Sequence, residues 1–469
     1  MATVTFSGMV SGIDTESLIN ATSDATRAAK VTPKEEKISE MKSENSALEE
    51  LKEMLNNLKT VVDGFSTLNG GAVARSATST DETVVAASAN KYGKKGSYNV
   101  EVSSLAKNSS YTLISDTPYT SPTAKINDTI ADTQTVDFTI GSPTPLETVS
   151  IDVTASTTLA DFVSEFNSKS DHATASLINR GTNSNPDYVV MVVSNSSGSE
   201  NGIATVNIPE ELKAGGGGSR VWDTGCVSVA GSDAVFSING VDVTRKSNTI
   251  NDVIDGLTFS LSSIGTATVT VDTDKEQTVA NLKEFVDLYN EIVEYISKND
   301  EVTREENGSE VRNIYGSLAK TNTDENLLSA LRSDISTAKA TAENSVRIFA
   351  DLGITTERDG TLAFKSETLE AALDQDANAV NEITISLGDS MGLTGGTIYS
   401  YTRLNGMIDV SINSNNTQIS DLNDRIARAE ELILKTEENM RARFARLEAT
   451  MSELQSTSSS LTSLLKIKD

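Results

Sequence analysis

The sequence has very few of the residues on which most enzymes depend. It contains one cysteine, Cys226, and one histidine, His172, in 469 residues. A structural zinc site takes about four Cys or His ligands, and a Ser-His-Asp triad would need this one histidine as its base. We expect a solvated His172, because it lies in the polar segment SKSDHATASL, and an inert Cys226 thiol without an internal disulfide. The sequence therefore predicts no catalysis, no metal and no cofactor.

Positive charge is also scarce. The chain has 39 Lys and Arg against 67 Asp and Glu, which gives a formal net charge of -28. Affinity for nucleic acid comes mainly from Lys and Arg that displace counterions from the phosphate backbone. We therefore expect neither nucleic acid nor an anionic membrane as a partner, and a chain that resists non-specific association.

Long apolar runs are missing. No window approaches the roughly 18 to 20 apolar residues of a membrane span, so membrane insertion is not expected. The N-terminus lacks the basic stretch and the apolar core of about 7 to 15 residues of a secretory signal. Export by another machine, or no export, stays open.

Aromatic residues make up only 5% of the chain and hydrophobic residues 37%, which favours extended helices and exposed β surface over one large core. The length suits about two to four domains. No proline follows Pro209. Because proline breaks helix interiors and central strands, its distribution separates a loop-rich middle from a regular C-terminal half.

Residues 34–75 carry a helical pattern of apolar residues at spacings of three and four. Such a seam is typical of a coiled coil or a helix bundle, and Asp63-Gly64 would end the helix. A helix this thin needs partner helices. Its predicted core residues are Leu48, Leu51, Leu55, Leu58 and Val62.

From about residue 75 the pattern changes to the alternation of half-buried strands, as in GSYNVEVSS. TVDFTI, ETVSIDV, ATASLI and YVVMVVS read as strands, and TTLADFVSEFNSKS as a helix that covers them. Asn239-Gly240 predicts a hairpin with a type I′ turn, and a second hairpin is expected between LTFSLSS and TATVTV near Gly265. We infer an inner β domain, residues 76–105 and 229–275, into which an outer β domain, residues 106–228, is inserted.

Helical patterns return in residues 276–440 and continue in a C-terminal leg segment, residues 441–469. The stretch VANLKEFVDLYNEIVEYI places Leu282, Phe285 and Tyr289 on one face. One long final helix begins near Leu404. Its predicted bundle residues are Ile419, Leu422, Ile426 and Ile433, and its sparse distal stripe is Phe444, Leu447, Met451, Leu454, Leu461 and Leu465.

Residues 1–33 read as a flexible N-terminal leg segment. Asp14 is placed as a helix N-cap, with Ile13 and Leu18 as a hydrophobic staple across it. The apolar stripe after Leu18 reduces to Ala21, Ala25 and Ala28. Such ends are marginal alone but could order against other subunits.

The predicted fold class is therefore α+β and multidomain. The N- and C-terminal helices pair in a coiled-coil-like bundle that forms legs, and two β-rich head domains, one inserted into the other, fill the middle of the chain.

Two site motifs fail on inspection. The opening SGMVSGID lacks the Gly-Lys-Ser/Thr end of a phosphate loop and follows no strand. The segment from Asp272 resembles a calcium loop in its first acids, but Gln277 stands where Gly is needed and Lys283 where Glu belongs. A strand-to-helix junction is the better reading of that segment.

Several stretches together resemble one family, the bacterial flagellar filament-capping proteins, also called hook-associated protein 2. These stretches occur in the family's order and cover about half of the chain. The ordered set is more specific than any single stretch. The matching stretches are FSGMVSGIDTESLI, GSYNVEVSSLAKNSS, FSINGVDVTRKSNTINDVIDGLTFSL, VANLKEFVDLYNEIVEYI, DLGITTERDGTLAFKSETLEAAL and MRARFARLEATMSELQSTSSSLTSLL.

The resemblance implies a structural protein and not an enzyme. Members of the family leave through the flagellar type III apparatus without a cleaved signal and assemble at the extracellular filament tip as a ring of about five subunits. Implied partners are further copies of the chain, flagellin, hook-filament junction proteins and a flagellar export chaperone. Carried over onto this sequence, the leg-contact candidates are Phe6, Met9, Ile13, Leu18, Phe444, Leu447, Met451, Leu454, Leu461 and Leu465.

An alternative function remains open at this point. In it the chain is a surface adhesin whose β-rich head, residues 76–275, binds mucus or host glycans, and the helices are only a stalk. This reading predicts binding by the head alone. An enzyme would need a chemistry that dispenses with histidine and cysteine.

Overall fold

A computed structural model describes residues 12, 14–213, 220–222, 225–307, 310–341 and 346–466. The described chain divides into two compact units. One unit, Val73–Gln277, is built from strands and a covering helix. The other, the helical unit, combines the described residues up to Ala72 with those from Thr278 onward. The sequence expectation had placed these boundaries after residues 75 and 275.

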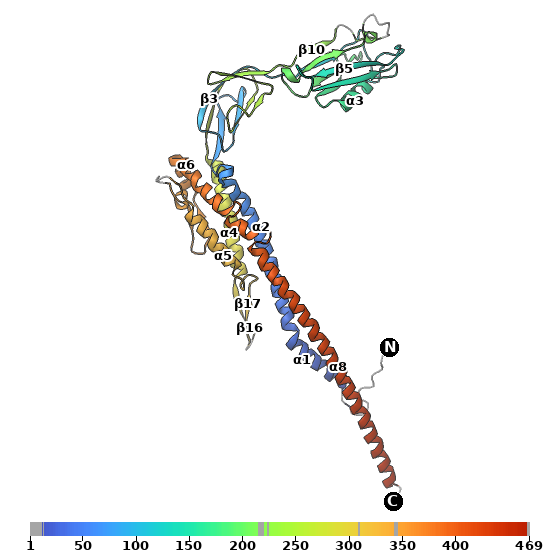
Figure 1. The fold of residues 1–469 in the computed structure, drawn as a ribbon, viewed down its shortest axis with the longest axis vertical. Coiled ribbons are helices and arrows are strands. Elements are labelled where there is room, and N and C mark those ends of the chain that lie inside the picture. Colours follow the sequence, from blue (N-terminus) through green and yellow to red (C-terminus); the bar gives the residue numbers. More distant parts are fainter. Residues whose placement is uncertain are drawn as a thin grey trace. The chain divides into compact units, whose positions relative to one another are not determined.

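The helical unit brings together helices from both ends of the chain (Figure 1). Its helices are α1 (Thr15–Lys30), α2 (Thr32–Phe65), α4 (Lys275–Asn299), α5 (Thr323–Thr337), α6 (Ser366–Met391), α7 (Thr397–Thr402) and α8 (Met407–Lys466).

The predicted seam of α2 faces the interior of this unit. Its five side chains are fully buried, as are those predicted for α4. Aromatic rings join the two helices, because Phe65 of α2 and Phe285 of α4 meet edge to face with centroids 6.3 Å apart. These buried side chains are the ones that the sequence pattern placed on the inner faces. They are Leu48, Leu51, Leu55, Leu58 and Val62 on α2, and Leu282, Phe285 and Tyr289 on α4.

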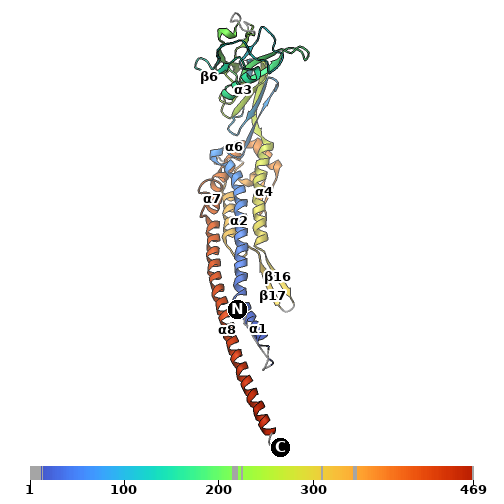
Figure 2. The same ribbon diagram turned by 90° about the vertical axis from the view of Figure 1, so that its right-hand side faces the viewer.

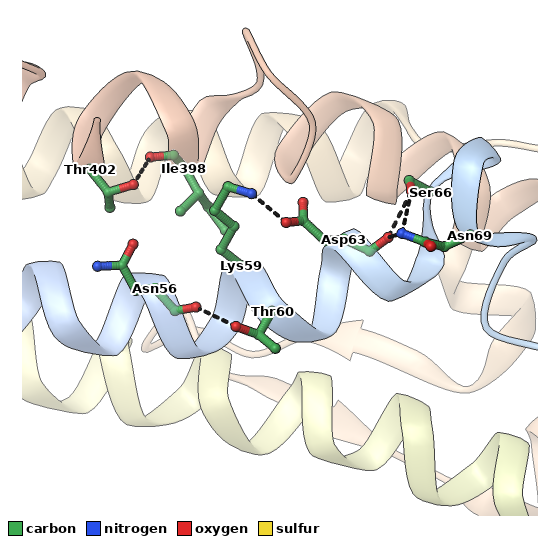
Figure 3. A network of polar contacts seen from close by, with 8 residues as sticks. All are labelled: Asn56, Lys59, Thr60, Asp63, Ser66, Asn69, Ile398 and Thr402. Carbon is green, nitrogen blue, oxygen red and sulfur yellow. Dashed lines mark hydrogen bonds and ion pairs between the residues drawn. The ribbon is translucent and has the colours of Figure 1, made fainter. Parts of the chain in front are cut away.

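A polar network ends α2, as Figure 3 shows. The carbonyl oxygen of Asp63 accepts hydrogen bonds from the Ser66 hydroxyl at 2.7 Å and from the Asn69 amide at 2.8 Å. The Asp63 carboxylate forms an ion pair with Lys59. The two hydrogen bonds satisfy the Asp63 carbonyl near the end of the helix, which continues to Phe65, slightly beyond the expected stop at Asp63-Gly64.

Two hairpins in the helical unit escaped the sequence reading, which expected only helices after residue 276. They are β16 (Val302–Asn307) with β17 (Glu310–Tyr315), and β18 (Ile354–Thr356) with β19 (Leu362–Phe364). The Asn307-Gly308 pair was the available signal for the first. Its strands are polar and lack a clean apolar alternation, so periodicity could not reveal them.

The inner β domain is a sandwich of two sheets. One sheet has the strand order β1-β15-β3-β11-β12 and the other β13-β14-β2. Valine, phenylalanine and leucine side chains from both sheets form one core. The strands are β1 (Ala74–Ser79), β2 (Val85–Ala89), β3 (Gly96–Ser104), β11 (Ala234–Ile238), β12 (Val241–Arg245), β13 (Thr249–Ile250), β14 (Leu257–Leu261) and β15 (Gly265–Asp274).

One predicted hairpin of this domain is confirmed and one is wrong. Asn239 and Gly240 have φ of 50° and 80°, as a type I′ turn between β11 and β12 requires. Strands β14 and β15 do not pair, because β14 joins β13 and β2 while β15 joins β1 and β3. Both strands bury alternate side chains in the same core, although they belong to opposite sheets. The local alternation is the same whether two strands pair in a hairpin or face each other across a core.

The outer β domain has its own core, centred on Phe138, Phe162 and Phe166. Thr158 and Asp161 form a capping box at the start of its helix α3, which the sequence predicted. Its sheets have the orders β10-β4-β8-β7 and β6-β5-β9. Its elements are β4 (Ser110–Leu113), β5 (Gln134–Ile140), β6 (Glu147–Val153), α3 (Leu159–Lys169), β7 (Ala173–Asn179), β8 (Tyr188–Ser194), β9 (Ile203–Asn207) and β10 (Val227–Val229).

The helical unit contains a buried carboxylate at the start of α5. Asp324 is fully buried, with both carboxylate oxygens shielded from solvent. Burial raises the pKa of Asp324 from 3.8 to about 6, and the charges of Asp300 and Glu325 add to the rise. Between about pH 4 and 6, the Asp324 carboxyl therefore keeps its proton in the folded protein but is ionised in the unfolded chain. Stability from this group falls as pH rises through that window and stays lost above it.

We predict that Asp324→Asn stabilises the protein at neutral pH. The neutral amide removes the buried charge, which should add about 2 to 3 kcal/mol to the unfolding free energy near pH 7.5 and almost nothing near pH 4. Urea unfolding of the helical unit at both pH values measures this. Glu367→Gln is the matched control, because Glu367 is an exposed acid in the first turn of α6. A gain that is the same at both pH values would contradict the interpretation.

Candidate functional site

The terminal helices are the part of the chain that the sequence singled out for assembly, and α1 begins as predicted. The carboxylate of Asp14 accepts a hydrogen bond from the Ser17 amide at 3.0 Å and caps the helix. Ile13, the expected staple partner, lies outside the described residues. The segment expected to be flexible is thus helical from Thr15 to Lys30.

Two arginine–glutamate ion pairs join α1 to α8. Arg27 donates two hydrogen bonds to the Glu430 carboxylate, and Arg441 donates to that of Glu16 at 3.1 and 3.3 Å. The partners lie eleven residues apart on both helices and pair in reverse order, so α1 runs antiparallel to α8 (Figure 2). Exposed pairs contribute roughly 0.2 to 1 kcal/mol each and are screened by salt, so they hold α1 lightly.

The face that α1 turns inward differs from the predicted stripe. Leu18 is 50% exposed, and Ala21, Ala25 and Ala28 are also exposed. The buried positions are instead Thr15, Ile19 and Ser23, and Ile19 is only 1% exposed. Two of the three buried side chains are small and polar, so α1 buries little apolar surface and rests mainly on Ile19.

Helix α2 continues the antiparallel arrangement on the proximal part of α8. Asn45 exchanges amide hydrogen bonds with Asn415 and Asn416 at 2.9 and 3.0 Å. Seven residues further along α2, Lys52 pairs with Asp409, which precedes Asn415 and Asn416 on α8, and lowers the pKa of that carboxyl. Amide pairs within a helix interface fix the register, because a shifted helix would leave them unsatisfied.

The distal part of α8 has a different character. Every residue from 449 to 463 is exposed, and the last buried side chain of α8 before that segment is Ile433. Phe444 is half-buried, while Leu447, Met451, Leu454 and Leu461 are 37 to 64% exposed. The helix itself passes unbroken through residue 440, where the sequence predicted a boundary. Burial, and not secondary structure, changes there.

Hydroxyl groups keep this exposed segment from being strongly apolar. Thr450, Thr457, Ser460 and Thr462 each donate a hydrogen bond at 2.8 to 3.0 Å to the carbonyl four residues earlier. Their polar atoms are thus satisfied within the helix and need no partner. The apolar residues that remain form a narrow stripe, too sparse for strong self-association.

The end of the chain also differs from the rest in charge. Residues 441–469 carry five basic and three acidic side chains, in a chain with a net charge of -28. The like-charge repulsion that the whole chain experiences is therefore absent from this segment. These side chains are Arg441, Arg443, Arg446, Lys466 and Lys468 against Glu448, Glu453 and Asp469.

The structure places the remaining candidates as follows. Phe6 and Met9 lie outside the described residues, and Leu465 lies within α8 but its side chain is not described. Ile433 is buried, whereas Ile419, Leu422 and Ile426, expected in the bundle core, are only half-buried. They lie between Asn415 and Asn416, which contact α2, and Glu430, which pairs with α1.

Sequence reasoning missed the ion pairs between α1 and α8 as well as Ile19. The equal spacing of Glu16 to Arg27 and of Glu430 to Arg441 was the available signal. Charges eleven residues apart return to the same helix face after three turns. In so acidic a chain, however, many such pairs can be drawn.

Within the described ranges, no helix is both long and apolar enough to span a membrane, and no three His, Cys, Asp or Glu side chains gather as metal ligands. His172 is exposed, as expected. Cys226 is half-buried, and its sulfur lies 3.4 Å from the amide nitrogen of Ile114.

Comparison with known proteins gives a consistent result over most of the chain. Two family models match in order: flagellar hook-associated protein 2 N-terminus over residues 11–109, and flagellar hook-associated protein 2 C-terminus over residues 231–456. A-type flagellar hook-associated protein 2 of Pseudomonas aeruginosa is 28% identical over 459 residues, which covers 90% of each chain. Flagellar hook-associated protein 2 of Escherichia coli K12 is 28% identical over 423 residues, 87% of this chain and 86% of the relative.

A solved structure has a similar fold. The crystal structure of the flagellar cap protein FliD D1-D2-D3 domains from Escherichia coli matches with a TM-score of 0.60 and 23% identity. The match covers 79% of this chain and 99% of that one. At this identity the likeness concerns the fold.

We predict that α1 depends on one side chain for its docking. Ile19→Ala removes the main buried apolar contact and should release α1, because such truncations typically remove about 2 to 5 kcal/mol. Hydrogen exchange of the α1 amides measures the release. Leu18→Ala is the matched control, since Leu18 is the adjacent, half-exposed residue of the same helix. Equal acceleration of exchange in both variants would contradict the assigned face.

Proposed function

The chain belongs to the flagellar hook-associated protein 2 family, and on that premise we propose that it caps the distal end of the bacterial flagellar filament and promotes folding and insertion of exported flagellin. The family is that of a flagellar cap protein. The role proposed for this chain is structural and not enzymatic. It rests on helical legs and an oligomeric plate of β-rich domains.

The exposed distal part of α8 is the observation that carries the mechanism. Helices without tertiary contacts are marginal in water, so residues 449–463 gain from any partner that covers their stripe. Fully burying one Leu or Met side chain contributes roughly 1.5 to 3 kcal/mol, so three such residues give a contact that can form and break. A leg of this kind can occupy a subunit site at the filament end and yield to incoming flagellin.

The α1 contact supports the same reversible use of the termini. Its two ion pairs are solvent-exposed and its buried face is small. An α1 helix held this lightly can dock, release and dock again without unfolding the α2 seam, whose leucines are fully buried. The loosely held leg helices thus work from a firmly packed bundle.

The proposed partners follow from the cap role. They are further copies of the chain in a ring of about five subunits, flagellin, the hook-filament junction proteins and an export chaperone. The location is the extracellular flagellum tip, reached through the flagellar type III apparatus without a cleaved signal. No contact in the described chain favours the adhesin alternative, and we do not carry it further.

We predict that the combined substitutions Met451→Ser, Leu454→Ser and Leu461→Ser abolish capping. These side chains are exposed, so the bundle should keep its stability while the leg loses its apolar stripe. Purified protein added to cells that lack the gene bypasses export, and filament length by electron microscopy with flagellin released into the medium gives the readout. We expect short or absent filaments and unpolymerised flagellin.

Ser452→Ala, Gln455→Ala and Ser459→Ala together form the control, because these exposed residues lie on the same segment of α8. The control should support normal filaments. Filaments of normal length with the serine variant, at an unchanged unfolding temperature, would refute the leg mechanism and leave only the family assignment.

A further inference from the structure

The two β domains are connected by a narrow stem of two chain segments, residues 105–109 and 230–233. Within it, Lys107 and Ser232 exchange backbone hydrogen bonds at 2.8 and 3.1 Å. The Ser232 hydroxyl adds a bond to the Leu105 carbonyl at 3.3 Å. A two-stranded ribbon is only marginally stable alone, so a stem of this kind would ordinarily act as a hinge between the domains.

Each end of the stem is fixed to one domain. Asn248 of the inner domain holds Ala106 through its side-chain amide, which accepts from the Ala106 nitrogen at 2.8 Å and donates to its oxygen at 2.9 Å. Ser109 exchanges hydrogen bonds with Ser194 of β8 at 2.9 and 3.0 Å in the outer domain. Bending of this strand is therefore confined to the short stretch between Ala106 and Ser109.

A turn of the outer domain, residues 197–200, crosses beside the stem to the inner domain. The amide and hydroxyl of Ser199 both donate to the Asp233 carboxylate, at 2.7 and 2.9 Å. The Ser197 hydroxyl donates to the Lys246 carbonyl at 2.7 Å, and the Lys246 ammonium pairs with Glu200. The turn is thus held both to Asp233 at the end of the stem and to Lys246 of the inner domain, and these contacts together resist bending of the stem.

Two glycines allow this close approach. Gly198 has a φ of 103°, and a Cβ on it would lie 2.7 Å from the Cβ of Lys246. A Cβ on Gly231 would lie 2.5 Å from the carbonyl oxygen of Gly198. The Gly198 amide also donates to the Lys107 carbonyl at 3.2 Å, which ties the turn to the middle of the stem. Any side chain at Gly231 would push the turn away.

We propose that the turn 197–200 is a strut, a brace that holds the two β domains as one rigid body. Asp233 binds the turn through its carboxylate, and Gly231 leaves the space in which the turn packs. Most of the stabilisation of the strut comes from the hydrogen bonds of Ser197 and Ser199 and from the close packing at Gly198 and Gly231. The Lys246–Glu200 pair contributes less, because both side chains are about half exposed and the pair is screened by salt. Without the strut, the stem becomes a hinge. This inference does not rest on the proposed function.

Spin labels on the full-length chain test the strut. Ser176→Cys on β7 and Asp242→Cys on β12, both exposed, report the distance between the outer and inner domains in a Cys226→Ser background. Double electron–electron resonance should give one narrow distance distribution. Gly231→Ala and, separately, Asp233→Ala should broaden it about twofold, as expected of a freed hinge. Fluorescence of the buried Trp222 checks that the outer domain remains folded.

Asp252→Ala is the matched control. It breaks the Arg245–Asp252 ion pair, which lies wholly within the inner domain and is about as exposed as the Lys246–Glu200 pair. The distance distribution between the spin labels should stay narrow in this variant. If Gly231→Ala fails to fold, Asp233→Ala decides the question. A broad distribution in the parent protein, or an unchanged one in the folded Gly231→Ala and Asp233→Ala variants, overturns the proposal. Neither readout involves filaments, so failure here is distinct from failure of the cap function.

Discussion

Helix α8 is longer than the set of helices that can cover it. Helix α2 lies antiparallel on its first part and α1 on its middle, in registers fixed by the Asn45 amide and by the two arginine–glutamate pairs. Because α1 begins at Thr15 and already reaches Arg441 through Glu16, nothing from α1 lies further along α8. Among the described helices, the distal exposure of α8 thus follows from where α1 starts. Assembly at that end is the consequence we propose.

The strength of packing is graded along the same helices. Leucines that are fully buried hold α2 in the bundle, a single isoleucine and exposed ion pairs hold α1, and residues 449–463 are held by no burial at all. Stability in a folded protein is local, so this gradient gives a firm base and progressively looser ends. A leg that must exchange partners needs such ends. Hydroxyl groups bonded back to their own helix keep the exposed end soluble meanwhile.

Much of this architecture was accessible from the sequence, and the misses have physical causes. The α2 seam, the outer-domain strands β5 to β8, α3 and the Asn239-Gly240 hairpin follow from local periodicity and turn chemistry. The pairing of β14 with β2 could not be predicted in this way, because the two strands lie far apart in the sequence. On α1, a stripe of alanines misled the choice of face, whereas Ile19 with two small polar residues makes the actual contact. The strut residues carry no local signal, since serine, glycine and aspartate are common in turns.

The central claim is that the distal part of α8 has no burying partner among the described residues and acquires one on assembly. Hydrogen exchange of the amides from 449 to 463, compared between the free protein and the protein bound at filament ends, tests it directly. We expect fast exchange in the free protein and strong protection at the filament end. Protection already present in the free protein, or none after binding, would contradict the account.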